Sequence, residues 1–93
     1  MKENEFSEVL RDLINKILSN SISSEELKKR IRDELETRNI WDSNDLLITD
    51  CYYALKHIDE EQISVKEWLY FQECFAAKRK YNLADKFLFI SLS

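Results

Sequence analysis

The chain of 93 residues contains no glycine and no proline. Glycine provides the positive φ of many helix C-caps and tight hairpin turns, and both residues punctuate sheet proteins. Their joint absence favours helices joined by Ser, Asn and Asp turns. Phosphate-binding loops and the dinucleotide fingerprint are excluded as well, because they bring backbone without a Cβ close to phosphate. We therefore do not expect the usual chemistry of ATP, GTP or NAD.

Histidine and cysteine are also scarce. His57 is the only histidine, and the two cysteines, Cys51 and Cys74, lack the spacing of a CxxC motif. A disulfide scaffold of this length would use more cysteines, and a zinc site needs about four ligands. The carboxylates after His57 offer oxygen ligands, but the spacing and the glycine of an EF-hand are missing. We expect two reduced core thiols, no metal and no cofactor.

Long apolar runs are missing too. The first residues, MKENEFSEVL, are charged and contain no apolar stretch of the kind found in a signal peptide. The longest run, FLFISLS at 87–93, is too short to span a bilayer. A net charge of −4 opposes non-specific binding to nucleic acid, which depends on Lys and Arg. We expect a cytoplasmic protein that contacts neither a membrane nor nucleic acid directly.

What the chain does contain is helical patterning. Ser23 with Glu26, and Ser64 with Glu67, have the spacing of a capping box, and Asp42 begins a looser third version. These starts predict helices over 4–19, 23–38, 42–59 and 64–80. Residues 82–93 fit either a short helix capped by Asn82 or a strand. The predicted fold is all-α, one domain over 1–93, a compact antiparallel bundle of four to five helices.

The apolar faces predict where two of these helices lie. The second helix has a narrow stripe of Leu27, Ile31 and Leu35 and balanced charges, so we expect it on the outside of the bundle. The fourth is apolar over most of its circumference, which is typical of a central helix. The basic run Lys78-Arg79-Lys80 is expected in its last turn, where cations oppose the helix dipole.

The acidity of the chain is concentrated in one segment. Residues 42–61 hold six carboxylates against one lysine, a charge of −5, while the whole chain carries −4. On a helical wheel, the apolar arc of this segment predicts core positions, and these are Leu47, Cys51, Ala54, Leu55 and Ile58. Tyr53 then lies beside Asp50 and His57, away from that arc. A tyrosine among carboxylates is typical of an interface with a basic partner.

The candidate partner-binding residues are the acidic side chains of this segment and its outward tyrosine: Asp42, Asp45, Asp50, Tyr53, Asp59, Glu60 and Glu61. A second interpretation stays open. In it, Tyr52 and Tyr53 pack at the edge of the bundle and the acids only keep the surface soluble. Catalysis is the weaker hypothesis, because Cys51, the nucleophile nearest to His57, faces the apolar arc. We therefore expect no enzyme.

One stretch resembles a known family. Leu13-Ile14 followed by Leu18, and then the run from Ile22 to Leu27 (ISSEEL), are similar to the N-terminal part of the immunity proteins of the colicin D type and of contact-dependent inhibition systems. The resemblance covers residues 10 to 35. It implies a small helical cytoplasmic protein that binds a cognate toxin, typically a tRNA-cleaving nuclease, and covers its basic active site with an acidic surface.

The first functional hypothesis is therefore an immunity protein that neutralises a basic protein toxin by binding it as a monomer or a weak homodimer. The alternative is a helical adaptor or regulatory protein that forms homo-oligomers through the aromatic-rich fourth helix. An enzyme that uses His57 is the third possibility.

Overall fold

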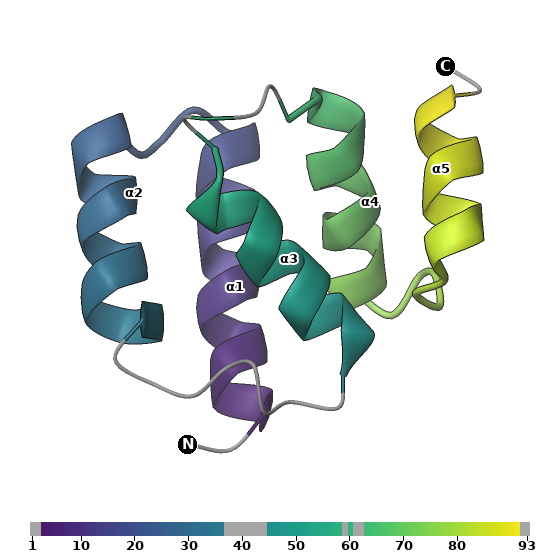
Figure 1. Cartoon of the computed structure of the whole chain (residues 1–93), viewed down its shortest axis with the longest axis horizontal. Helices are drawn as coiled ribbons and strands as arrows, with labels where there is room; N and C mark the ends of the chain where they lie inside the picture. The colour runs from purple at the N-terminus through teal and green to yellow at the C-terminus, as the bar shows by residue number, and fades with distance from the viewer. Residues whose placement is uncertain (1–2, 37–44, 59, 61–62, 92–93) are drawn as a thin grey trace.

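The structure is a computed structural model and describes residues 3–36, 45–58, 60 and 63–91 (Figure 1). Its elements are α1 (Glu3–Leu18), α2 (Ser24–Arg30), the π-helix η1 (Ile31–Glu36), α3 (Leu46–Lys56), α4 (Val65–Phe75) and α5 (Leu83–Ser91). Every regular element in these ranges is a helix, which confirms the predicted all-α fold. The open question about residues 82–93 is answered for 83–91, which form α5.

The helices form a bundle with α3 laid across its front (Figure 1). α2 lies at one edge beside α1, and α5 lies at the other edge beside α4. α1 and α4 are antiparallel and make the most extensive contact, and α5 runs antiparallel to α4. This arrangement places α2 on the outside of the bundle, as its narrow apolar stripe predicted.

The core is built around α4, which contacts α1, α3 and α5. Its residues Trp68, Tyr70, Phe71 and Cys74 are buried, so the prediction of a central fourth helix is confirmed. The stripe of the second helix is buried as expected, at Leu27, Ile31 and Leu35. The remaining core side chains come from α1 and α3: Phe6, Leu10, Leu13, Ile14, Ile48, Cys51, Tyr52, Ala54 and Leu55.

Polar caps begin the helices at the places the sequence marks, with one exception. The Ser23 and Ser64 hydroxyls accept hydrogen bonds from the backbone N–H groups of Glu26 (3.1 Å) and Glu67 (3.2 Å). Asn82 does the same for Asp85, at 3.1 Å. α3 begins only at Leu46, because Asp45 caps it by accepting from the Leu47 N–H at 2.9 Å. The predicted cap Asp42 lies outside the described residues, and the start predicted there was too early.

The helix ends show how the chain turns without glycine. Asn20 and Ala77 both have a φ of 60°, and each follows a helix closed by a wide backbone hydrogen bond. Ser21 N–H donates to Lys16 at 2.9 Å, and Lys78 N–H donates to Glu73 at 2.9 Å. These bonds are those of a Schellman motif. α4 therefore ends at Phe75 rather than at residue 80, and the prediction that 78–80 form its last turn was wrong.

Candidate interaction surface

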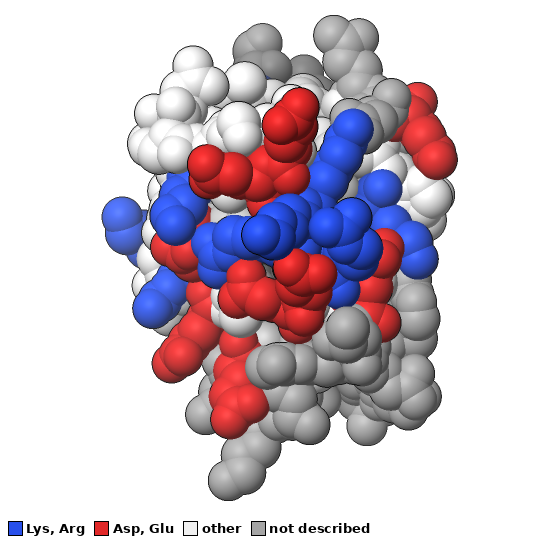
Figure 2. Space-filling model, turned by 90° about the vertical axis from the view of Figure 1, so that its left-hand side faces the viewer, with Lys and Arg blue, Asp and Glu red and all other residues white. Residues whose placement is uncertain are grey.

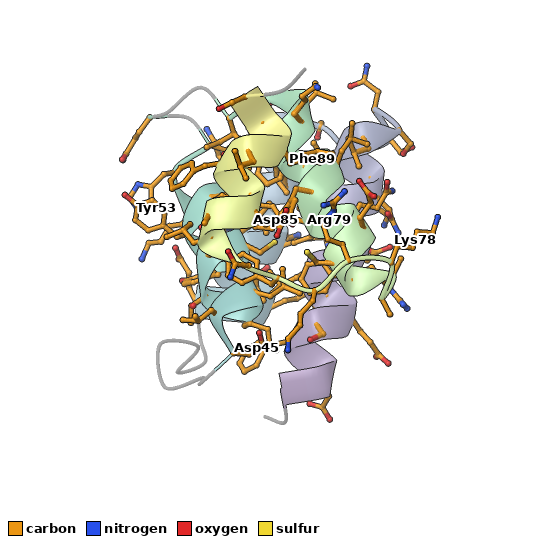
Figure 3. The ribbon with its side chains drawn as sticks, turned by 90° about the vertical axis from the view of Figure 1, so that its right-hand side faces the viewer. Asp45, Tyr53, Lys78, Arg79, Asp85 and Phe89 are labelled. Carbon is orange, nitrogen blue, oxygen red and sulfur yellow. The ribbon has the colours of Figure 1, made fainter. Side chains whose placement is uncertain are left out.

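The predicted acidic face is spread along the outward side of α3. Asp45 stands at the N-terminus of the helix, Asp50 and Tyr53 lie in its middle turns, and Glu60 follows its C-terminus. The other three members, Asp42, Asp59 and Glu61, lie outside the described residues. Figure 3 labels Tyr53, which lies to the left of α5, and Asp45, which lies below it.

Tyr53 is the exposed tyrosine of the pair. Its side chain is 44% exposed, and its ring lies against the ring of His57 with 4.3 Å between centroids. His57 is in turn held by Glu60, whose Oε2 is 2.9 Å from Nδ1. The half-exposed Tyr53 ring is thereby held, through His57, close to the carboxylate of Glu60.

Tyr52, in contrast, is buried. The buried side of α3 is the row Ile48, Cys51, Tyr52 and Leu55, with Ala54 beside it. Leu47 and Ile58, which the wheel placed in the core, are only partly buried and pack against its edge. The core arc lies further round the helix than predicted, because the large ring of Tyr52 takes part in it. Tyr52 therefore packs into the core, whereas Tyr53 is left exposed.

Asp50 is committed to a polar cluster rather than to solvent. Its Oδ2 accepts hydrogen bonds from the Tyr81 hydroxyl at 2.6 Å and from the Lys86 ammonium at 2.7 Å. Lys86 also reaches Glu67 at 3.3 Å. The Asp50 side chain is 21% exposed, and that of Lys86 only 6%. Breaking a buried pair by removing one partner typically costs about 3–5 kcal/mol. The first role of Asp50 is therefore structural, because it stabilises the packing of α5 through Lys86.

The charges of this cluster determine its proton affinities. Burial opposes the charged form of Lys86, but the hydrogen bond and charge of Asp50, with the charge of Glu67, outweigh it and raise the pKa of Lys86. Burial and the neighbouring Asp50 also raise the pKa of Tyr81. The Lys86 ammonium lies 5.2 Å from the centre of the Phe71 ring, which adds a cation–π contact. The cluster thus ties α5 to both α3 and α4.

Arg79 forms a second tie, between α5 and α4 (Figure 3). Its guanidinium donates to Asp85 at 3.1 Å and lies over the ring of Phe89, 4.8 Å from the centroid. The hydroxyl of Tyr70, beneath it, pairs with the backbone of Asn82 and with Asp85. The central residue of the basic run is therefore structural, and Lys78 and Lys80 remain as its exposed members.

An apolar groove runs between α3 and α5. Two hollows, of about 550 and 290 Å³, share Leu46, Tyr81 and Leu83 in their walls. Phe87 completes the first and Tyr53 the second. Leu46 is 69% exposed, and Leu83 and Phe87 are also more than half exposed. We call this surface the α3–α5 groove. The sequence pattern does not predict this groove, because its residues come from two separate helices.

The α2 side is different, because charges of both signs gather there (Figure 2). A band of Lys and Arg crosses this face with carboxylates on either side. Arg30 illustrates the pairing, since it binds Glu34 within the helix and Asp12 of α1. Its hydrogen bond lowers the pKa of Asp12. This face therefore carries charges of both signs, and Arg30 is paired within it.

The two thiols and the possible metal ligands are the groups that could take part in catalysis. Cys51 and Cys74 are buried and free, as predicted, and burial raises the pKa of both thiols, which opposes the reactive thiolate. Within the described ranges, no three His, Cys, Asp or Glu side chains gather closely enough to hold a metal ion. Nor is any helix in those ranges long and apolar enough to cross a membrane.

The aromatic side chains of α4 are not available at the surface. Trp68, Tyr70 and Phe71 are buried inside the single chain, and Phe75 is partly buried. Homo-oligomerisation through this helix, which is the alternative hypothesis, stays a prediction and would have to use the exposed side chains of α4, such as Val65.

Comparison of the chain with models of protein families, with curated protein sequences and with solved structures gave no significant match. A function must therefore be inferred from the residues and surfaces described above.

Proposed function

We propose that this chain is an immunity protein: it binds a cognate bacterial toxin, a basic tRNA-cleaving nuclease domain, and covers the active site with the acidic segment 42–61. A nuclease presents Lys and Arg to the phosphates of its substrate, so a surface of carboxylates can occupy the same groups. The concentration of negative charge in this one segment supports such a role.

The single observation that carries the proposal is the arrangement of Tyr53, His57 and Glu60 at the C-terminal half of α3. A half-exposed tyrosine ring is held against an imidazole, which is itself bound to an exposed carboxylate. Tyrosine is among the residues that dominate binding energies at interfaces, and a fixed ring loses little conformational entropy on binding.

The residues of the proposed face have unequal roles. Tyr53 is the anchor, Glu60 steers the basic partner, and Asp45 adds charge at the other end of α3 while capping the helix. Asp50 holds α3 and α5 in position rather than contacting the toxin, because Lys86 and Tyr81 both donate hydrogen bonds to its Oδ2. Asp42, Asp59 and Glu61 belong to the face on sequence grounds alone.

The proposal predicts that a nuclease domain is encoded directly upstream of this gene, and the test uses that domain. The chain should bind that domain and suppress its cleavage of tRNA at equimolar concentration. Glu60→Lys should slow association about tenfold at low salt, because steering by charge acts mainly on the association rate. Tyr53→Ala should raise the dissociation rate about tenfold or more. Stopped-flow fluorescence measures both rates.

A matched control is Glu25→Lys, which makes the same change of charge in the first turn of α2. It should leave both rates nearly unchanged. The proposal is contradicted if the neighbouring nuclease is not bound, or if Glu25→Lys and Glu60→Lys slow association equally.

A further inference from the structure

The α3–α5 groove leaves large apolar side chains uncovered in a single chain. Leu46, Leu83 and Phe87 are each more than half exposed, and they meet across the groove rather than being scattered. Single exposed apolar residues are common, but a contiguous group rimmed by polar residues marks an interaction site. The groove therefore needs an occupant.

The ends of the groove carry opposite charges. At the N-terminal end of α3, a hollow of about 820 Å³ is lined by Leu46, by the three cations Lys78, Arg79 and Lys80, and by the carboxylate of Asp45. Cations therefore outnumber carboxylates at this end, and among the described residues the Lys80 ammonium forms no ion pair. At the C-terminal end, past Tyr53, stands the exposed carboxylate of Glu60. An apolar strip with a cation at one end and an anion at the other is complementary to its own copy rotated by 180°.

We propose that the α3–α5 groove is a self-association surface on which a second copy of this chain docks with α3 antiparallel to α3. In this arrangement Leu46 enters the groove of the partner subunit, and Lys80 meets Glu60 of the partner subunit. By the two-fold symmetry the same contacts form twice. The dimer is weak and salt-dependent, because its polar contacts lie at the exposed rim.

This inference does not depend on the toxin. The two proposals do share Tyr53 and Glu60, so self-association and toxin binding compete for the same side of α3. At high concentration the isolated chain is therefore a dimer, and this dimer dissociates when a tighter partner binds.

The experiment is sedimentation equilibrium of the isolated chain over a range of concentrations. The expected result is a reversible monomer–dimer equilibrium that raised salt shifts toward monomer. Leu46→Lys should weaken dimerisation at least about tenfold, since it places a charge in the apolar centre. Val65→Lys is the matched control, because Val65 is equally exposed but lies at the start of α4, outside the groove. It should leave the equilibrium unchanged.

A charge exchange tests the antiparallel geometry. Lys80→Glu and Glu60→Lys should each weaken dimerisation, and the double variant should restore it, since the pair forms between subunits. Circular dichroism checks that each variant is folded. A strict monomer at millimolar concentration overturns the proposal, as does a dimer that Leu46→Lys leaves intact or a double variant no stronger than the single ones. If Leu46→Lys is monomeric and still binds the toxin, toxin binding does not require the dimer, and the two proposals are tested independently.

Discussion

Ala77 shows at the residue scale what the absence of glycine demands. Its φ of 60° allows the Lys78 N–H to close the end of α4, but a residue with a Cβ is less stable in this conformation than glycine. We expect Ala77→Gly to raise the free energy of unfolding by about 0.5–1 kcal/mol, the relief of the Cβ contact being partly offset by the entropy of the unfolded chain. Urea denaturation measures the change.

Ala76→Gly provides the control at the adjacent position. Ala76 has a φ of −84°, which any residue adopts, so glycine offers no conformational benefit there and should lower stability by about 0.5–1 kcal/mol. If both substitutions destabilise the protein equally, the left-handed conformation of Ala77 is not a source of strain.

Asp50 shows what a residue-level interpretation of the sequence can miss. The sequence predicted that Asp50 lies beside Tyr53 on the outward side of α3. It did not predict the hydrogen bond that Asp50 accepts from Lys86. The two residues are 36 positions apart, and no local pattern links them. A lysine inside the apolar run LADKFLFIS was the available signal, since lysine is rarely buried unless it is paired. Only the tertiary packing of α5 against α3 shows that the partner of Lys86 is Asp50.

At the scale of elements, three helix starts could be predicted from their caps, whereas the start of α3 and the end of α4 could not. A start is marked by side chains of fixed type and spacing, and Ser23, Ser64 and Asn82 all act as the sequence predicts. An end is usually marked by glycine, which this chain lacks. Ala77 carries no such mark, so the pattern of the fourth helix appeared to continue to residue 80.

The cap of α2 can be tested with two neighbouring serines. Ser23 accepts the hydrogen bond of the Glu26 N–H, whereas Ser24 is the first residue of the helix. We expect Ser23→Ala to lower the free energy of unfolding by about 1 kcal/mol, because one backbone donor loses its partner. Ser24→Ala should be neutral or slightly stabilising, since alanine has the higher helix propensity. Equal effects of the two substitutions in urea denaturation would show that the cap contributes nothing.

At the scale of the whole molecule, the α3–α5 groove is the feature that the sequence hides most completely. Leu46 and Phe87 belong to helices with separate patterns, and each pattern places such a residue in the core as readily as outside it. Only the packing of α3 across the bundle and of α5 at its edge brings them together at the surface (Figure 1). A sequence predicts which face of a helix is apolar more easily than which apolar residues stay uncovered.

The polar cluster beneath this groove predicts how the folded molecule responds to alkali. The pKa of Tyr81 is raised above its usual 10.0, first by burial and then by Asp50. The pKa of Lys86 is raised above 10.5, because its carboxylate partners outweigh the effect of burial. Both groups hold their protons to higher pH in the folded state than in the unfolded one. The stability they contribute is therefore complete below about pH 10 and is lost as the pH rises through their folded-state pKa values.

We expect the urea midpoint of the protein to fall progressively as the pH rises above about 10, and Tyr81→Phe to make that fall shallower. At pH 8 the same substitution should cost about 1.5 kcal/mol, because Asp50 loses a hydrogen bond to its charged oxygen. Tyr53→Phe, which changes an exposed ring, is the matched control and should leave both the midpoint at pH 8 and the slope unchanged. Equal slopes for the protein and Tyr81→Phe would contradict the role of Tyr81. They would show that the alkaline response comes from other groups, with buried Cys51, whose pKa is raised well above 9.0 by burial, as the next to test.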